Sequence, residues 1–292
     1  MTSTLRILQP QPGIFAYYDG RILGKRLYSE EPNWLDDGAY GLGVASYAVV
    51  DDGEALVCDT HISEQHGRFI RSHLEDLGVR NIRVVLTHFH NDHIAGTAAF
   101  ADCEIVAPKR TCELLTERRD WITSRKPTIR IVAPTQPFEH QMSMTIGGRT
   151  VELRQYNIHS EDHAVLWMAD EGILIAGDSL EDPATYIAEP ASVAVHITEL
   201  RRLRELPIRH ILPAHGDPER IANGGYDVSF ITASLDYLER LTAVGGLELA
   251  GRQSLREFQN VHFSSGASVY FESYEAVHRG NVAALIALEN SQ

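Results

Sequence analysis

The chain has 292 residues, and its 26 Lys and Arg against 40 Asp and Glu give it a net charge of −14 at pH 7. With 43% hydrophobic and 23% charged residues it has the composition of an ordinary globular protein, which excludes a disordered, collagen-like or coiled-coil chain. The acidic total disfavours a general nucleic-acid binder, because such proteins need clustered Lys and Arg to displace counterions from phosphates.

The first part of the chain predicts strands joined by tight turns. Its apolar runs are rich in β-branched and aromatic residues, and Asp and Gly residues between two of them predict a hairpin. Ahead of the last of these strands, Ser63 predicts the start of a helix that Gly78 ends. The predicted strands cover residues 13–18, 44–50, 55–58 and 82–87.

The rest of the chain repeats this alternation. Strands are predicted at 142–146, 151–156, 164–168, 173–176 and 211–212, and helices at 191–206, 228–243 and 272–288. Two β-rich halves with helices beside them predict an α/β fold in which two sheets pack face to face, a four-layer αββα sandwich. We expect this domain to cover residues 1–250, and residues 251–292 to form a C-terminal extension that acts as a brace, a lid or an oligomerisation element.

Cysteine usage and the N-terminus bear on the compartment. Cys58, Cys103 and Cys112 are odd in number and lack C-x-x-C spacing, so we expect buried reduced thiols rather than disulfides or a thiolate zinc site. The N-terminus lacks the apolar core of a secretion signal, and no stretch approaches 18 apolar residues. We therefore expect a cytoplasmic protein that acts on a small molecule without binding nucleic acid or membrane, and a homodimer stays open.

The densest group of chemically active residues directly follows the predicted strand at 82–87. Residues 88–93 read His-Phe-His-Asn-Asp-His, three imidazoles and a carboxylate within six positions. Residues two apart on an extended backbone point to the same side, so His88 and His90 can converge on one ion. If the chain then turns into a helix, Asp92 and His93 lie in its first turn and reach a second ion. The spacing suits two metals rather than one.

Three more polar residues stand where predicted strands end. His159, Asp178 and His215 each follow a different apolar strand. Loops at strand ends hold ligand-binding groups in place because the sheet beneath them is rigid. With the first cluster they supply five His and two Asp, enough for two ions that share Asp178 and leave a bridging position open. An open position is typical of catalytic rather than structural metal sites.

At these residues the sequence resembles the metallo-β-lactamase superfamily. The H-x-H-x-D-H motif is complete at 88–93, the later His, Asp and His follow in the family's order, and the resemblance covers roughly residues 15–245. It implies two Zn²⁺ per chain, with Fe, Mn or Co as alternatives, and an Asp59 that supports the site from behind the ligands. It assigns His88, His90 and His159 to one metal, Asp92, His93 and His215 to the other, and Asp178 to both.

Such a site predicts a hydrolase. Two divalent ions lower the pKa of a bridging water and so present hydroxide near neutral pH. We expect it to attack a carbonyl, with Asp92 holding the water and moving its proton, and so to cleave an ester, lactone, thioester or amide. Acyl-homoserine-lactone hydrolases of the superfamily share the whole ligand set, which favours a lactone or ester substrate.

Related activities stay open to different degrees. A glutathione thioesterase would need a basic C-terminal motif that the sequence after Gly251 does not show, and true β-lactamases are secreted and usually lack the bridging Asp. A persulfide dioxygenase would use His88, His159 and Asp178 on a single iron. A phosphodiesterase is disfavoured by the charge of −14, and a binding protein with a vestigial site by the presence of all seven ligand positions.

Four other residues have a functional and a structural interpretation. Tyr186 is our second candidate catalytic residue beside Asp92, because its phenol would donate to a substrate oxygen, and core packing is the alternative. His163 matches a family position that is not a ligand, and His61 either lines the pocket or is structural. Trp34, in a predicted loop at 32–38, either walls the pocket or packs. The other His residues outside the motif have no pattern around them.

Overall fold

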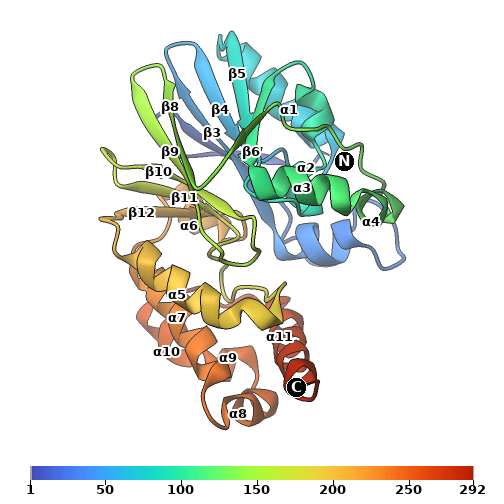
Figure 1. Ribbon diagram of the computed structural model, residues 1–292, viewed down its shortest axis with the longest axis vertical. Coiled ribbons are helices and arrows are strands. Elements are labelled where there is room, and N and C mark those ends of the chain that lie inside the picture. Colours follow the sequence, from blue (N-terminus) through green and yellow to red (C-terminus); the bar gives the residue numbers. More distant parts are fainter. Residues whose placement is uncertain (1, 292) are drawn as a thin grey trace.

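Figure 1 shows the computed structural model, which describes residues 2–291 and has two β-sheets at its centre. The first sheet has the order β1-β2-β3-β4-β5-β6-β7, and the second β12-β11-β10-β9-β8. The first comprises β1 (Arg6–Gln11), β2 (Ile14–Asp19), β3 (Val44–Asp51), β4 (Glu54–Cys58), β5 (Asn81–Val85), β6 (Glu104–Pro108) and β7 (Gln136–Phe138). The second comprises β8 (Gln141–Ile146), β9 (Arg149–Gln155), β10 (Ala164–Met168), β11 (Ile173–Gly177) and β12 (His210–Pro213).

Helices cover the outer face of each sheet. Beside the first sheet lie α1 (Glu64–Asp76), α2 (Asn91–Ile94), η2 (Thr97–Phe100), α3 (Lys109–Glu117), α4 (Arg119–Ser124) and the π-helix η1 (Trp34–Tyr40). The second half carries η3 (Pro190–Ser192), α5 (Val193–Arg204), α6 (Pro218–Ala222), α7 (Ser229–Thr242), α8 (Gly246–Arg252), α9 (Leu255–Phe258), α10 (Asn260–Ser265) and α11 (Tyr274–Glu289).

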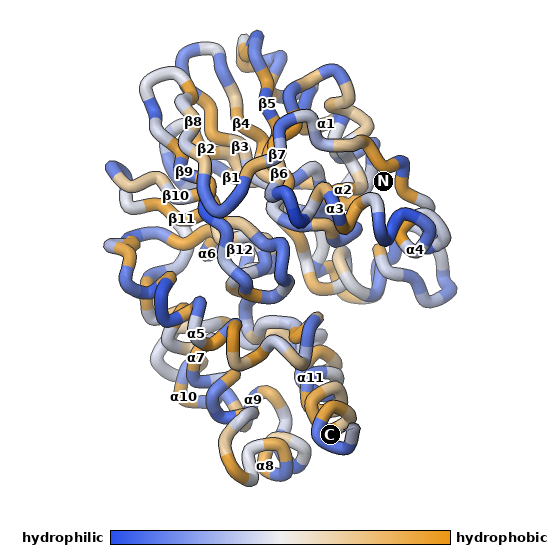
Figure 2. The backbone as a smooth tube through the Cα atoms, viewed as in Figure 1, coloured by the Kyte–Doolittle hydropathy of each residue, from blue (hydrophilic) through white to orange (hydrophobic). Residues whose placement is uncertain are grey.

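Alternating side chains connect the four layers. In β6, Val106 belongs to the core between the sheets, whereas Ile105 and Ala107 belong to the core under the outer helices of the first sheet. This two-residue alternation is what a strand buried on both faces requires. Figure 2 shows the hydrophobic residues running along the central strands. The predicted four-layer αββα sandwich is therefore confirmed.

Most predicted elements are present with small shifts at their ends, and the cap of α1 is one of the confirmed details. The Ser63 side chain accepts a hydrogen bond from the backbone N–H of His66, 3.3 Å away, and Gly78 has a φ of +82° just beyond the helix. A left-handed glycine at this place is a usual helix stop, because it has no Cβ to clash.

Two expectations were wrong. Residues 34–40, in and after the predicted loop, form the π-helix η1, because Asn33 caps it and the buried Asp36 accepts backbone N–H groups from Leu27, Tyr28 and Ser29. The three thiols are free, as expected, but only Cys58 is buried, while Cys103 and Cys112 are half-buried.

Helices α7 to α11 gather with α5 at one end of the molecule, beside the second sheet, whereas α6 lies by the sheets and contacts β1 and β2 (Figure 1). Helix α7 packs against α5, and α11 contacts α8, α9 and η3. The C-terminal residues are thus folded against the segment that follows β11. Within residues 2–291, no helix has the length and apolar character needed to cross a membrane.

Candidate metal centre

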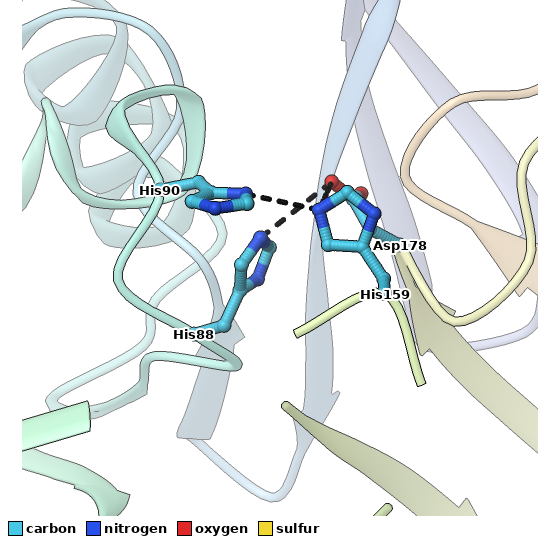
Figure 3. A group of neighbouring side chains, drawn as sticks. All are labelled: His88, His90, His159 and Asp178. Carbon is cyan, nitrogen blue, oxygen red and sulfur yellow. Dashed lines mark hydrogen bonds and ion pairs between the residues drawn. The ribbon is translucent and has the colours of Figure 1, made fainter. Parts of the chain in front are cut away.

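The motif residues lie where the first sheet ends and α2 begins. After β5 the chain bends at His88 and Phe89, His90 has extended φ and ψ of −66° and 151°, and α2 then starts at Asn91. This bend interrupts the extended backbone that the sequence predicted, yet His88 and His90 both point toward His159 and Asp178 (Figure 3). Asp92 and His93 follow in the first turn of α2, as the spacing predicted.

The first group of converging side chains comprises His88, His90, His159 and Asp178. One ligand atom from each lies within 4.8 Å of those of the others. The Nε2 of His159 is 2.9 Å from the Nδ1 of His90, and Asp178 Oδ2 is 3.6 Å from the Nε2 of His88 and 3.5 Å from that of His159. Three imidazoles and one carboxylate thus face one small volume, and two of them come from each sheet.

The second group comprises Asp92, His93, His215 and again Asp178, with the same 4.8 Å limit. The Nε2 of His215 lies 3.3 Å from Asp92 Oδ2 and 3.6 Å from Asp178 Oδ1, and the Nε2 of His93 lies 3.1 Å from Asp178 Oδ2. Asp178 is therefore common to both groups. All seven predicted ligand positions meet here, in the two sets that the resemblance implied.

The chemistry of these atoms fits divalent cations. His88 Nε2 and Asp178 Oδ1 are buried, yet neither has a hydrogen-bond partner among residues 2–291. Burial, together with His159, lowers the pKa of His90 to about 3, so its imidazole is neutral at pH 7, which is the form that binds metal. Burial alone would raise the pKa of Asp178, but His93 and His215 hold it well below its usual value. The site thus offers ionised carboxylates beside the neutral imidazoles of His88 and His90. Against the effect of burial, Asp178 raises the pKa of His93 and raises that of His215 to about 9, so these two imidazoles would lose a proton when metal binds.

Partners behind the ligands fix their orientation. Asp59, in the turn after β4, accepts hydrogen bonds from His93 Nδ1 at 2.7 Å, from the Thr87 backbone N–H at 2.7 Å and from the Thr87 hydroxyl at 2.8 Å. The Nδ1 of His215 donates to the carbonyl oxygen of Gly43 at 2.6 Å. In each case the other ring nitrogen, Nε2, is left free to face the centre.

His163 lies next to the centre without joining either group. Its buried ring accepts a hydrogen bond from the backbone N–H of Asp178 through Nε2 and contacts the Ser179 hydroxyl through Nδ1, both at 3.0 Å. His163 thus supports the segment that carries the shared carboxylate.

His61 and Trp34 have structural contacts. The fully buried ring of His61 donates to the carbonyl oxygen of Tyr17 and accepts from the Ile62 N–H, and it stacks on His66 with ring centroids 4.5 Å apart. The indole N–H of Trp34 donates to the carbonyl oxygen of Pro127 at 3.0 Å, which ties η1 to the segment after α4.

Tyr186 is placed beside the centre and is not packed in the core. Its side chain keeps 46% of its surface exposed, and its ring centroid lies 6.1 Å from that of His159. Its carbonyl oxygen also accepts a hydrogen bond from His159 Nδ1 at 3.1 Å. The phenol is accessible from solvent next to a predicted metal ligand.

Glu181 is a neighbour of the centre that sequence reasoning missed. This carboxylate is 2% exposed, and its Oε1 lies 3.4 Å from the Nδ1 of His159. The sequence offers only its position three residues after Asp178 as a signal, because an acidic residue in a loop is ordinarily solvated.

Comparisons with known proteins give one family-model match and two curated relatives. Residues 39–215, more than half of the chain, match the family model described as the metallo-beta-lactamase superfamily. A beta-lactamase-like protein 2 homolog from Caenorhabditis elegans is 28% identical over 178 residues, which cover 61% of this chain and 55% of that protein. A linear primary-alkylsulfatase from a Pseudomonas species is 23% identical over 211 residues, covering 56% of this chain and 39% of that protein. The chain spans about half or less of these relatives.

Solved structures share the fold at low sequence identity. A metallo-beta-lactamase from Pontibacter korlensis aligns with a TM-score of 0.62 at 17% identity, covering 81% of this chain and 99% of that one. The DIM-1 metallo-beta-lactamase aligns with a TM-score of 0.60 at 17% identity, covering 81% and 97%. At such identities the likeness concerns the fold alone.

Proposed function

The chain belongs to the metallo-β-lactamase superfamily, and from this premise we propose that it is a zinc-dependent hydrolase that cleaves an ester or lactone bond in a small molecule. The observation that carries the proposal is the position of Asp178. Its carboxylate lies within 3.6 Å of His88 in one ligand group and within 3.1 Å of His93 in the other. A carboxylate that faces two complete ligand sets is what a pair of neighbouring cations requires.

Each ligand group would hold one Zn²⁺, and Asp178 would contribute to both. The first ion would be held by His88, His90 and His159, and the second by Asp92, His93 and His215. When bound, such a pair of ions supplies an activated water and polarises the scissile carbonyl. Asp92 keeps 18% of its side chain exposed against 4% for Asp178, so Asp92 is the carboxylate positioned to accept the proton of that water.

Tyr186 completes the proposed machinery for an ester or lactone. A carbonyl substrate develops negative charge on oxygen as the tetrahedral intermediate forms, and the leaving oxygen needs a proton. The exposed phenol beside His159 is a donor for such an oxygen. All seven predicted metal ligands are brought together, whereas a dioxygenase with a single iron would need only three of them. The complete set therefore favours a hydrolase over a dioxygenase.

The first experiment is elemental analysis of protein purified without chelator or added metal. We expect about two zinc ions per chain, and hydrolysis of aryl esters and lactones at neutral pH that a chelator abolishes and Zn²⁺ restores. About one iron per chain, with oxygen consumed in the presence of a persulfide, would contradict the proposal and support the dioxygenase. A linear alkyl sulfate, suggested by the alkylsulfatase relative, and bis-p-nitrophenyl phosphate belong in the same panel. Faster turnover of either one would reject the carbonyl substrate.

Tyr186→Phe tests the phenol separately. We expect kcat for the best ester or lactone to fall about 10- to 100-fold, because a donor to the developing oxyanion is lost. The metal content is expected to stay that of the unaltered chain, since the backbone carbonyl that contacts His159 is retained. Steady-state kinetics on the metal-loaded variant checks this. An unchanged kcat would remove Tyr186 from the mechanism and leave Asp92 as the one remaining candidate catalytic residue of the two.

A further inference from the structure

The loop between β11 and η3 carries Asp178 and turns a second carboxylate inward. Glu181 is 2% exposed, and its Oε1 accepts a hydrogen bond from the Tyr186 N–H at 2.9 Å while lying 3.4 Å from His159 Nδ1. One oxygen of Glu181 thus faces both the imidazole of a predicted ligand and the backbone of the candidate catalytic tyrosine. An acceptor at Nδ1 fixes which nitrogen of a ligating His faces the metal. For His159 this acceptor is the Tyr186 carbonyl oxygen at 3.1 Å, so Glu181 acts on the imidazole through its nearby charge and by holding the Tyr186 backbone.

The other oxygen of Glu181 is held by the C-terminal helix. The hydroxyl of Tyr274, at the start of α11, donates to Glu181 Oε2 at 3.3 Å. In the described part of the chain this is the only hydrogen bond to Oε2. Both residues are buried, so this oxygen is shielded from bulk water. A buried carboxylate oxygen left without a donor costs free energy, so the hydroxyl constrains where Glu181 sits.

A second residue on the same face of α11 holds the same loop. Asn281 follows Tyr274 by seven residues, about two helical turns, and is fully buried. Its side chain accepts from the Ile187 N–H and donates to the Thr185 carbonyl oxygen, both at 2.9 Å. The backbone on both sides of Tyr186 is therefore tied to α11.

The segment before α11 reaches the other ligand group. Asp182 is fully buried and accepts hydrogen bonds from the hydroxyl of Ser268 at 2.5 Å and the N–H of Val269 at 2.9 Å. Its own backbone N–H donates to the carbonyl oxygen of His215 at 2.9 Å. Residues 268–281 therefore contact loop positions next to His159 and next to His215, one ligand from each group.

From these contacts we infer that residues 268–281 are a brace that positions the metal centre, with Glu181 as the positioning residue for His159 and Tyr274 as the residue that fixes Glu181. This inference rests on the proposed metal centre. It assigns a role to the C-terminal extension that the sequence left as a brace, a lid or an oligomerisation element. Neither residue is itself a ligand, so both act on metal affinity through His159.

The test measures Zn²⁺ affinity by competition with a chromophoric chelator, which needs no substrate. Glu181→Ala is expected to lower the affinity for one of the two ions about 10- to 100-fold, as happens when a ligating His loses the residue that orients it. Tyr274→Phe is expected to lower that affinity about 3- to 10-fold. The double variant is expected to match Glu181→Ala alone, because the hydroxyl acts only through that carboxylate. Glu181→Gln, which keeps an acceptor for the Tyr186 N–H, is expected to recover most of the affinity.

Tyr270→Phe is the matched control. It removes a tyrosine hydroxyl from the same segment, but that hydroxyl donates to Glu275 at 3.1 Å rather than to the loop, so Zn²⁺ affinity is expected to stay unchanged. The inference is overturned if Tyr274→Phe and Glu181→Ala bind both ions like the unaltered chain, or if they only lower the melting temperature. It is also overturned if their effects on affinity add. An unaltered chain that binds no Zn²⁺ would contradict the proposed function itself.

Discussion

Asp178→Ala is expected to strip metal from both ligand groups and to abolish hydrolysis. The variant removes the one side chain that faces His88 in the first group and His93 and His215 in the second. It also leaves four buried imidazoles and the half-buried His90 with Asp92 as the only remaining carboxylate of the set. Loss of a residue that only supports a metal ligand costs up to about 100-fold in affinity, and Asp178 is itself a predicted ligand. We therefore expect the affinity for Zn²⁺ to fall by more than about 100-fold, and the activity to fall at least as far.

Elemental analysis and ester or lactone kinetics on the same preparation check this result. Asp170→Ala is the control, because it makes the same change at an exposed turn between β10 and β11 and should keep both metal and activity. Retention of about two ions per chain with full activity in Asp178→Ala would end the dinuclear interpretation. Loss of one ion alone would mean that Asp178 serves a single site.

Asp59→Ala is expected to weaken metal binding by the second ligand group and also to lower the stability of the fold. Three donors lose their acceptor: the imidazole of His93, and the backbone N–H and hydroxyl of Thr87. We expect Zn²⁺ affinity to drop about 10- to 100-fold. Because Asp59 is buried, we also expect the metal-free protein to lose about 3–5 kcal/mol of unfolding free energy, as when one partner of a buried pair is removed.

Chelator competition and urea unfolding of the metal-free chain measure the two effects separately. Asp59→Asn keeps an oxygen acceptor of the same shape and should recover part of both. Asp76→Ala, at the exposed end of α1, controls for the loss of a surface carboxylate and should change neither. If metal affinity stayed constant while stability fell, Asp59 would be a purely structural residue.

The ligand set could be predicted because each member carries a local signal. His88 to His93 is a continuous motif, and His159, Asp178 and His215 are polar residues directly after apolar strands. The brace could not be predicted in this way. Glu181 and Tyr274 are 93 residues apart, and neither stands in a pattern that distinguishes it from a solvated acid or a core aromatic residue. Only the packing of α11 on the loop brings them together.

In the fold, too, elements with a local sequence pattern could be predicted and elements that depend on distant contacts could not. Most hairpin strands were predictable from alternation and turn residues, but β1 was missed, since it is an edge strand that contains Pro10. Strand β6 was missed as well, since four of its five residues are buried and a strand covered on both faces has no alternating pattern. The three-residue β7 is too short to give a signal. The π-helix η1 depends on the carboxylate of Asp36, which collects three backbone N–H groups from residues 27–29. The periodicity of the sequence gives no sign of such a contact.

Each ligand group draws two residues from the segment that follows β5 of the first sheet and two from segments that follow strands of the second. Neither sheet alone can therefore complete a coordination set. In a chain whose three cysteines are all free, bound ions would cross-link segments as distant as His93 and His215, which elsewhere is the work of disulfides. Metal supply would then govern how firmly the two halves of the sandwich stay closed, because an ion that binds only the folded chain stabilises it by mass action.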